Sequence, residues 1–440
     1  MIFSQTIQNK NKKPKKEFAV KVTGIIAEYN PFHNGHAYHI EETKKGTEAD
    51  YIVAVMSGNF VQRGAPAILS KYERTKMALE NGADLIIELP VTAALSSAEG
   101  FAAGGVSLLD SLGVVNTLSF GAEASSPEET DTLQTVAGLL AEEPDEIQTL
   151  LSSYLKQGNS FPAARMKAVT DYLEAAGQNT DNISSLLSSP NNILAIEYLK
   201  AIKRYHSDLT PFTVARKGKG YHDTELSCAL ASATGIRKFL LEKSLQKAEE
   251  SLSKAVPSSV YQSLCTASSQ NCFLREDDFS AMLYYALTTC AQKPEPFLSS
   301  VPDLELRIRN LLEGFISWSQ FAMLLKSKNQ TYTAISRYLT HALLGIGRDQ
   351  FELAADFHFA PYARILGFRR DSAPLLKEIQ KRSRIPVITR LAKDCSFLTP
   401  EQRELLNLDI HASELYNYIR TLKSGQQMLS DYRQPLIYIG

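Results

Sequence analysis

Four short apolar runs, separated by amphipathic stretches, occupy the N-terminal part of the chain. They lie at 22–27, 51–56, 84–89 and 117–120. Unbroken apolar runs are typical of strands buried on both faces, and helices are the usual connection between parallel strands. The pattern therefore predicts an α/β fold with a doubly wound, parallel sheet.

The stretches between the apolar runs carry helix start and stop signals. Ser70 precedes a helical stretch that stops at Gly82, and Pro190 opens another helix. A fifth strand is expected at 212–215. The alternation of strands and helices thus continues well beyond the first four strands.

Helical periodicity dominates from residue 246 to the C-terminus. We therefore divide the chain into a flexible basic tail over 1–20, a Rossmann-like α/β domain over 21–245 and a mostly helical domain over 246–440. The tail contains five lysines but neither the apolar core nor the cleavage site of a secretory signal. We expect it to be a floppy segment, with nonspecific contact to RNA as the alternative.

Composition excludes several classes of protein. With 44% hydrophobic residues, 22% charged residues and a net charge of −1, the chain is ordinary for a globular protein, so contact with a polyanion requires a local basic patch. No apolar stretch is long and uncharged enough to cross a membrane. The five cysteines are scattered without a CxxC pair, which supports neither a disulfide framework nor a zinc knuckle. We expect a protein of the reducing cytoplasm.

The sequence His-Asn-Gly-His at 33–36 directly follows the first predicted strand. Open α/β sheets bind ligands at the carboxyl ends of their strands, where a new helix offers unpaired N–H groups to phosphate. His33 and His36 lie three residues apart, so both face that point, and imidazole donors there would stabilise the charge on departing pyrophosphate. Two alternatives remain. One is an Asn-Gly turn with surface histidines, and the other is metal binding by these residues and His39, without a supporting carboxylate or cysteine.

A second polar cluster begins the helix expected at 232–241. Its Ser-x-Thr-x-x-Arg pattern consists of Ser232, Thr234 and Arg237. The hydroxyls would cap the helix and leave N–H groups for phosphate, and the guanidinium would clamp it. A simple capped helix is the alternative. Together with His-x-Gly-His after a first strand, this element resembles the nucleotidyltransferase superfamily.

Longer stretches resemble the bacterial tRNA(Met) cytidine acetate ligase family. They are GIIAEYNPFHNGHAYH at 24–39, AVMSGNFVQRGAPAILSKYERTKMALENGADLIIELP at 54–90, SFGAE at 119–123, PNNILAIEYLKAI at 190–202 and SATGIR at 232–237. The resemblance implies that acetate and ATP, the latter as a substrate, form acetyl-adenylate and pyrophosphate. The 4-amino group of the wobble cytidine of elongator tRNA(Met) would then take the acetyl group, giving 4-acetylcytidine and AMP.

The resemblance also implies the residues of the site. His33, His36 and Arg237 would act in catalysis. ATP would contact the stretch Ile26, Ala27, Glu28, Tyr29, Asn30, Pro31, Phe32, His33, Asn34, Gly35, His36, Ala37, Tyr38 and His39. Further ATP contacts would come from Gly121, Asn191, Arg216, Lys217, Ser232 and Thr234. Mg²⁺ is expected with the triphosphate, held mainly by phosphates and water, because no pair of acidic residues stands out as its ligands.

Local charge suggests where the two other substrates bind. A small carboxylate needs a positive pocket, and Arg63 follows the second predicted strand at the ligand-binding edge, although a salt bridge within the loop is the alternative. Residues 361–393 hold nine Lys or Arg and only two acidic residues, which predicts a phosphate track for tRNA unless this is a solvated basic face. The residues assigned to this track are Arg364, Arg369, Arg370, Lys377, Lys381, Arg382 and Arg384. No membrane and no protein partner are inferred.

Two other functions fit parts of the pattern. A free-standing adenylyltransferase that makes a small nucleotide would use the same histidines, but the long helical half is unusual for such an enzyme. A noncatalytic RNA-binding protein would keep ATP as a structural ligand. Acetate-dependent release of pyrophosphate distinguishes the ligase from both.

Overall fold

The computed structural model describes residues 20–124, 126–178, 180, 183–215, 232–242, 249–291, 302–327 and 330–440. Within these residues the main sheet contains eight strands in the order β10-β8-β5-β2-β1-β6-β7, with β9 paired to β8. The strands are β1 (Val22–Ala27), β2 (Tyr51–Ser57), β5 (Leu85–Leu89), β6 (Thr117–Ala122), β7 (Thr210–Ala215), β8 (Ala363–Arg369), β9 (Val387–Ile388) and β10 (Ile437–Ile439). A separate hairpin joins β3 (Phe60–Val61) to β4 (Ala65–Pro66).

The strands β5, β2, β1, β6 and β7 run parallel to one another. The chain passes from β1 through β2 to β5, and then returns to the other side of β1 with β6 and β7. This reversal leaves a crevice at the carboxyl ends of β1 and β6, where doubly wound sheets bind ligands. The predicted fold class is confirmed, and the five predicted strands correspond to β1, β2, β5, β6 and β7.

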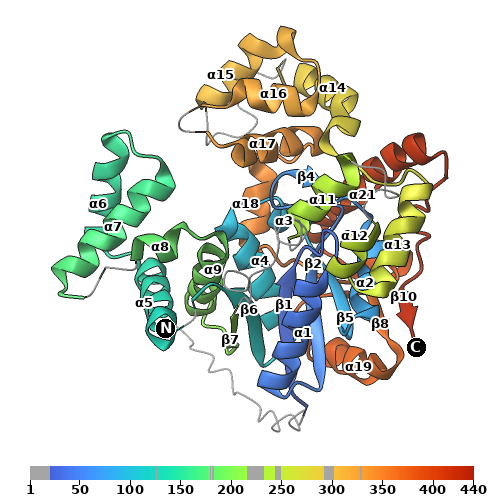
Figure 1. Ribbon diagram of the computed structural model, residues 1–440, viewed down its shortest axis with the longest axis horizontal. Coiled ribbons are helices and arrows are strands. Elements are labelled where there is room, and N and C mark those ends of the chain that lie inside the picture. Colours follow the sequence, from blue (N-terminus) through green and yellow to red (C-terminus); the bar gives the residue numbers. More distant parts are fainter. Residues whose placement is uncertain are drawn as a thin grey trace, which may run out of the picture.

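Alternate residues of β2 belong to two hydrophobic cores, one on each face of the sheet. Val53 and Val55 pack with α4 and α9, whereas Ile52, Ala54 and Met56 pack with α1 and α2. Successive side chains of a strand point to opposite faces, so an unbroken apolar run requires helices on both sides, as Figure 1 shows. The helices up to residue 269 are α1 (Asn34–Thr47), α2 (Lys71–Glu80), α3 (Val91–Ala94), α4 (Ala98–Ser111), α5 (Pro127–Glu142), α6 (Asp145–Lys156), α7 (Phe161–Ala175), α8 (Ile183–Ser188), α9 (Pro190–Arg204), α11 (Ala233–Glu242), α12 (Glu249–Ala255) and α13 (Ser258–Ser269).

The helix signals in the sequence are found where they were predicted. The hydroxyl of Ser70 caps α2 by accepting the backbone N–H of Glu73, whose side chain accepts the N–H of Ser70 in return. Pro190 occupies the first turn of α9, where its missing N–H costs nothing. Local sequence therefore fixes the starts of two helices that border the ligand-binding edge of the sheet.

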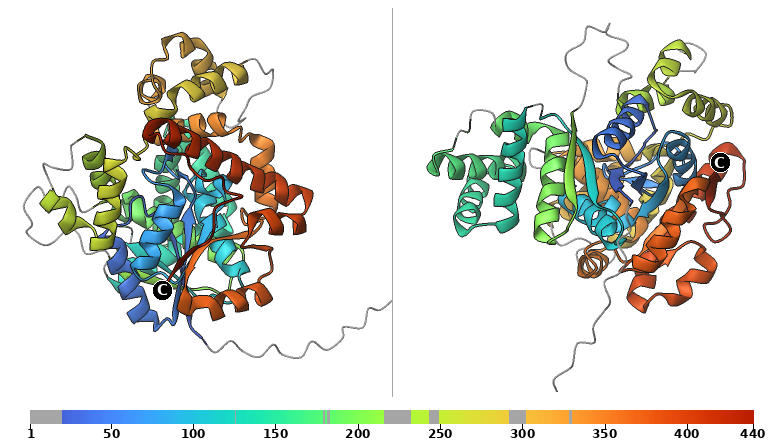
Figure 2. Two further views of the ribbon diagram at one scale, coloured as in Figure 1. Left: turned by 90° about the vertical axis from the view of Figure 1, so that its right-hand side faces the viewer. Right: turned by 90° about the horizontal axis from the view of Figure 1, so that it is seen from below.

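The second half of the chain is mostly helical, as predicted, but it also contributes to the sheet. β8 pairs antiparallel with β5, and β10 pairs parallel with β8, so strands beyond the boundary predicted at residue 245 extend the sheet of the α/β part. Figure 2 shows α21 and the C-terminal end of the chain against the same body as the sheet. The remaining helices are α14 (Ser280–Ala291), α15 (Pro302–Leu311), α16 (Trp318–Leu325), α17 (Tyr332–Leu344), α18 (Arg348–Asp356), α19 (Ala373–Arg382), α20 (Leu391–Asp394) and α21 (Pro400–Ser424).

Two expectations from the sequence concern the N-terminal basic tail and the absence of membrane-spanning helices. The predicted basic tail lies, up to residue 19, outside the described residues. Among the helices that the structure describes, none has both the length and the apolar character needed to span a membrane.

Candidate active site

A cavity of about 510 Å³ lies at the carboxyl ends of β1 and β6, and we call it the β1–β6 cavity. Its volume falls in the range of small-ligand sites, roughly 300–1,000 Å³. It occupies the crevice that the strand order predicts. Ten residues predicted to bind ATP line it: Ile26, Ala27, Glu28, Tyr29, Gly35, His36, Tyr38, His39, Gly121 and Asn191.

His33 and His36 form a reciprocal cap at the N-terminus of α1. Nδ1 of His33 accepts the backbone N–H of Gly35 at 3.0 Å, and Nδ1 of His36 accepts the backbone N–H of His33 at 3.2 Å. The rings stack with their centroids 3.8 Å apart. Because each Nδ1 is an acceptor, the hydrogen of each neutral ring lies on Nε2. The cap therefore makes both Nε2 atoms donors at the positive end of a helix.

The surroundings of the two histidines differ from those of a surface turn. His33 is only 7% exposed, and a Cβ atom on Gly35 would lie 2.8 Å from Cε1 of the His33 ring. Gly35 is thus needed for the close approach of the ring, which a loose surface turn would not require. Nε2 of His39 lies 3.0 Å from the hydroxyl of Ser119. Within the described residues, no group of three His, Cys, Asp or Glu side chains is placed to hold a metal ion.

The loop before His33 is held by hydrogen bonds from three directions. The side-chain oxygen of Asn30 accepts the backbone N–H of Ile68 at 2.8 Å, and the backbone carbonyl oxygen of Asn30 accepts a hydrogen bond from Arg237 at 2.6 Å. Arg74, which is fully buried, donates to the carbonyl oxygen of Glu28 at 2.6 Å. Burial, opposed by Glu28 and reinforced by Arg63, lowers the pKa of Arg237. The loop before the His-x-Gly-His motif is therefore held in place by residues from three distant segments of the chain.

A second helix N-terminus forms the opposite wall of the β1–β6 cavity. α9 begins at Pro190, and its first residues border the cavity together with Gly121 of β6. The Asn191 side chain donates to the Glu123 carboxylate at 2.9 Å, while Asn192 accepts the backbone N–H of Glu123 at 2.8 Å. These bonds fix the start of α9 against the loop after β6. Two positive helix ends therefore meet at one cavity, which favours a phosphate-bearing ligand.

The hairpin β3–β4 brings cations to the rim. Arg63 is exposed and lines the cavity beside Gln62 and Arg337. The carbonyl oxygen of Gly64 accepts hydrogen bonds from the hydroxyls of Ser336 at 2.6 Å and of Thr340 at 2.8 Å, so the hairpin is fixed to α17. Burial lowers the pKa of Arg337. The cavity thus combines imidazole donors, helix ends and guanidinium groups, a set suited to a nucleotide and a small acid.

Comparison with known proteins agrees with this geometry. The family model described as HIGH Nucleotidyl Transferase matches residues 20–431. The tRNA(Met) cytidine acetate ligase of Clostridium kluyveri is 41% identical over 423 residues, which cover 95% of this chain and 99% of that protein. The chain belongs to the tRNA(Met) cytidine acetate ligase family. The ligase of that name from Acetivibrio thermocellus is 37% identical over 402 residues, covering 90% of this chain and 94% of that protein.

Solved structures of the family support the fold over almost the whole chain. Thermotoga maritima TmcAL bound with alpha-thio ATP is 30% identical, with a TM-score of 0.83, and covers 95% of this chain and 99% of that chain. The apo form of the same protein has a TM-score of 0.85 at the same identity and coverage. The predicted membership of the family and the predicted fold are therefore confirmed.

Not every predicted ATP contact lines the cavity. Asn30, Pro31 and Phe32 are buried and support the loop, and the Asn34 side chain donates to the carbonyl oxygen of Lys254. His33 and Ala37 are absent from the lining, although the His33 ring lies against His36. At the start of α11, the Ser232 hydroxyl accepts the backbone N–H of Gly235 at 3.1 Å, and the Thr234 hydroxyl accepts a hydrogen bond from Arg237 at 3.1 Å. Arg216 and Lys217 lie outside the described residues.

Some lining residues were missed by the sequence-based prediction. They are Ile25, Gln62, Ala98, Phe101, Phe120, Pro190, Ile193, Leu194, Tyr198, Val214, Ala215 and Arg337. Most of them follow or end a predicted strand, or lie near the start of α4 or α9. The rule that α/β sheets bind ligands at the carboxyl ends of their strands would therefore have found them. Arg337 carries no such signal.

The basic stretch predicted to bind tRNA continues past β8 to the amino ends of the parallel strands, opposite the end at which the cavity lies. β8 is antiparallel to β5 and pairs Phe368 with Leu85, so the carboxyl end of β8 meets the amino end of β5. Arg369, Arg370 and α19 follow that end, whereas the β1–β6 cavity lies at the carboxyl ends of the parallel strands. Figure 1 shows α19 at the lower end of the sheet. A five-residue strand spans about 17 Å, so this surface is distant from the cavity. It remains a candidate for the body of a tRNA rather than for its reacting base.

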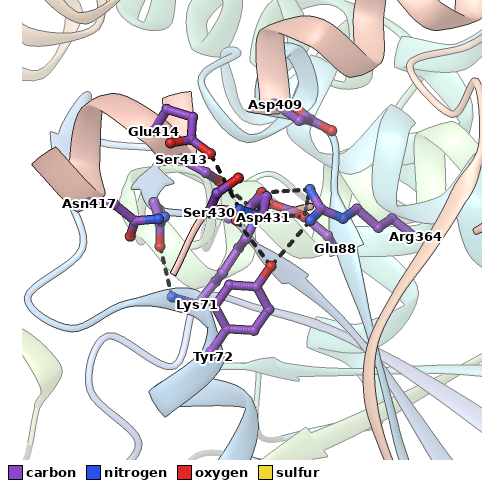
Figure 3. A network of polar contacts seen from close by, with 12 residues as sticks. Lys71, Tyr72, Glu88, Arg364, Asp409, Ser413, Glu414, Asn417, Ser430 and Asp431 are labelled. Carbon is purple, nitrogen blue, oxygen red and sulfur yellow. Dashed lines mark hydrogen bonds and ion pairs between the residues drawn. The ribbon is translucent and has the colours of Figure 1, made fainter. Parts of the chain in front are cut away.

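Arg364 does not belong to that surface. It is 4% exposed, and its Nη1 lies 2.9 Å from Asp431 and 3.1 Å from Glu88. Lys71 completes the buried network, 2.7 Å from Glu88 and 2.8 Å from Asp431 (Figure 3). A cation neutralised in the interior cannot contact a phosphate at the surface, so the prediction that Arg364 binds tRNA is wrong. The ion pairs of Lys381 and Arg382 with Glu378, and of Arg384 with Asp110, lie nearer the surface.

Proposed function

We propose that the protein is an ATP-dependent ligase that joins acetate to the 4-amino group of the wobble cytidine of elongator tRNA(Met). The observation that carries the proposal is the cap of α1, in which the His36 ring, stacked on that of His33, borders the β1–β6 cavity at a helix N-terminus. The similarity to tRNA(Met) cytidine acetate ligases over nearly the full chain supports the choice of substrates. Since its tRNA substrate is cytoplasmic, the protein would act in the cytoplasm.

In the first step, a carboxylate oxygen of acetate attacks the α-phosphorus of ATP. A bond forms between that oxygen and phosphorus, the bond to the β-phosphate oxygen breaks, and pyrophosphate leaves with the electron pair. The Nε2–H groups of His33 and His36 and the first N–H groups of α1 stabilise the charge on pyrophosphate. Because the cap holds these donors in place before ATP binds, little reorganisation is needed during the reaction.

Arg63 would orient the acetate. Its side chain is exposed at the rim of the cavity, where a guanidinium can pair with a small carboxylate. Mg²⁺ would enter with the triphosphate. Glu28 is the sole carboxylate among the described residues that line the cavity, and its Oε1 accepts the backbone N–H of Gln62 at 3.0 Å. The other ligands of the ion would therefore be phosphates and water.

In the second step, the 4-amino nitrogen of the cytidine attacks the carbonyl carbon of acetyl-adenylate. The new carbon–nitrogen bond forms, the bond from that carbon to the AMP oxygen breaks, and AMP leaves with the electron pair. The nitrogen loses one proton to solvent. The products are AMP and tRNA(Met) with 4-acetylcytidine at the wobble position.

Exchange of labelled pyrophosphate into ATP tests the first step without tRNA. The proposal predicts exchange that requires acetate and is weak with propionate or with no acid. Exchange that is independent of acetate, or that requires a phosphorylated small molecule, would point to a free-standing adenylyltransferase instead. Absence of exchange with every acid would favour a noncatalytic role for bound ATP.

A further inference from the structure

Two cavities of the structure meet at one arginine. A second cavity, of about 720 Å³, is lined in part by residues of α4, α9 and α17, as the β1–β6 cavity is, and we call it the α17 cavity. Arg337 of α17 lines both cavities. A group bound at Arg337 is therefore within reach of ligands in either cavity. Such a position suits a reaction in which an acetyl group passes from one substrate to another.

Arg337 is a cation without a carboxylate partner among the described residues. Its side chain is partly buried, and burial lowers the pKa of the guanidinium, which still remains charged at physiological pH. A guanidinium has five N–H donors. The one hydrogen bond that the described residues show for this side chain runs from Nη1 to the carbonyl oxygen of Gln62 at 3.5 Å, longer than an ordinary hydrogen bond. Because an unpaired charge held away from water is costly, the site favours an anionic ligand.

The other lysine and arginine side chains in the two linings differ from Arg337. In the α17 cavity, Lys200, Arg204 and Arg348 lie 2.8, 2.9 and 2.6 Å from a glutamate carboxylate. Arg63 is exposed and lines the β1–β6 cavity alone. Among the described residues of the two linings, Arg337 is therefore the one cation that is unpaired, partly shielded from water and shared by both cavities.

The hairpin β3–β4 fixes the backbone around Arg337. Ser336, which precedes it, and Thr340, almost one turn further along α17, donate to the carbonyl oxygen of Gly64 at 2.6 and 2.8 Å. Figure 1 shows β4 next to α17. The hydroxyl of Thr340 also donates to the carbonyl oxygen of Ser336 at 2.8 Å. A donor on such a fixed segment needs little reorganisation during a reaction.

We propose that Arg337 donates to the acetate oxygen that does not attack ATP and remains bonded to that oxygen through both steps, an assignment that rests on the proposed function. In the first step this oxygen shares the negative charge of the carboxylate, and it becomes the carbonyl oxygen of acetyl-adenylate. It takes up negative charge again when the 4-amino nitrogen adds to the carbonyl carbon. The carbonyl forms again as the bond to the AMP oxygen breaks and AMP leaves with that electron pair. One guanidinium thus serves both acid binding and acyl transfer.

The second step requires a donor at the boundary between two substrates. The acetyl carbon is bonded to the adenylate, so it lies in the β1–β6 cavity when the acceptor arrives. The acceptor base needs space of its own beside that carbon, and the α17 cavity adjoins at Arg337. Arg63 lines one cavity only, so Arg337 is the better placed of the two to bond the carbonyl oxygen during transfer.

Transfer from synthetic acetyl-adenylate to elongator tRNA(Met) tests the second step without the first. Arg337→Met removes the donors and keeps an unbranched side chain. We expect its rate of transfer to fall about 10²- to 10³-fold, the value of a donor on a developing oxyanion. Arg337→Lys keeps a charged donor and should transfer about tenfold faster than Arg337→Met, the value of one hydrogen bond. Transfer by Arg337→Met at the wild-type rate would overturn the proposal.

Exchange of labelled pyrophosphate into ATP tests the first step. In Arg337→Met the KM for acetate should rise about tenfold or more, with the KM for ATP nearly constant, because one charge-assisted hydrogen bond is lost. Equal rises in both KM values would assign Arg337 to a phosphate of ATP and overturn the proposal. Arg348→Met is the matched control, since Arg348 lines the α17 cavity alone and is paired with Glu352. It should change neither the KM for acetate nor the transfer rate.

The two proposals fail in different ways. If the wild-type protein shows neither acetate-dependent exchange nor transfer from acetyl-adenylate, the proposed ligase activity fails, and the assignment of Arg337 fails with it. If the wild-type protein shows both and Arg337→Met matches it in both assays, the ligase stands and the assignment alone falls. Urea unfolding of each variant detects a merely structural role. A loss of transfer that follows a loss of stability would also overturn the assignment.

Discussion

His36 has two separable tasks at the N-terminus of α1. Its Nδ1 accepts the backbone N–H of His33 at 3.2 Å, and its Nε2–H is the donor assigned to pyrophosphate. In His36→Asn, the amide oxygen lies near the position of Nδ1, so the cap is retained while the donor is lost. His36→Ala removes both. The pair of variants therefore separates catalysis from helix capping.

The size of each effect follows from the geometry. A donor fixed on a developing oxyanion contributes about 10²- to 10³-fold to kcat, so both variants should lower acetate-dependent pyrophosphate exchange by that factor. A distance of 3.2 Å lies at the long end of hydrogen-bond lengths. Loss of the cap in His36→Ala should therefore cost about 0.5–1 kcal/mol, the lower part of the range for helix caps. His36→Asn should unfold at the wild-type urea concentration.

Exchange of labelled pyrophosphate into ATP measures the first effect, and urea unfolding measures the second. His411→Asn, which changes an exposed histidine of α21, is the matched control and should alter neither. A folded His36→Asn protein that exchanges pyrophosphate at the wild-type rate would refute the role of the imidazole donors. Loss of exchange that merely follows loss of stability would do the same.

Three further changes test other parts of the structure. Arg63→Ala should raise the KM for acetate about tenfold or more, with the KM for ATP nearly constant, because one charge-assisted hydrogen bond is lost; equal changes in both KM values would argue against acetate binding. Arg364→Met should lower the free energy of unfolding by about 3–5 kcal/mol, since Glu88 and Asp431 then share Lys71 alone in a buried site. A cost near zero in urea unfolding would show that the network is not buried in solution. Burial, together with the charge of Glu88, raises the pKa of Asp409 to about 7, so the folded protein holds this proton more tightly than the unfolded chain. Stability relative to Asp409→Asn should therefore fall as pH rises from about 4 to about 7 and stay level above that, and a pH-independent difference would contradict the assignment.

The sheet and the histidine motif were predictable because their signals are local. β1, β2 and β5 are unbroken apolar runs, which already imply parallel strands covered on both faces. The His-x-Gly-His motif acts within a single helical turn, so its geometry depends on residues that are adjacent in the sequence. The family resemblance added the substrates, which no local pattern contains.

Arg337 was not predictable, because contacts between distant segments bring it to the site. Gly64 has a φ of +71°, and a Cβ atom there would lie 2.2 Å from the backbone nitrogen of Arg337. The hairpin and α17 therefore meet through backbone contact at a glycine, with hydroxyls of Ser336 and Thr340 on its carbonyl oxygen. Such contacts leave no periodicity in the sequence.

The error at Arg364 has a related cause. Counting lysine and arginine over a stretch treats every cation as if it were at the surface. The pairing of β8 with β5 instead places Arg364 opposite Glu88, and the C-terminal segment adds Asp431. Strand pairing between distant segments thus decided which cations of the stretch are buried.

Transfer of labelled acetate to tRNA is the most direct test of the proposed activity. The protein is incubated with ¹³C-labelled acetate, ATP and a transcript of elongator tRNA(Met), and the digested RNA is analysed by mass spectrometry. We expect labelled 4-acetylcytidine at the wobble position, formed only with ATP and with one AMP released per acetyl group. Unmodified cytidine after complete acetate-dependent pyrophosphate release, or label in the RNA without ATP, would contradict an acetyl-adenylate route to the wobble base.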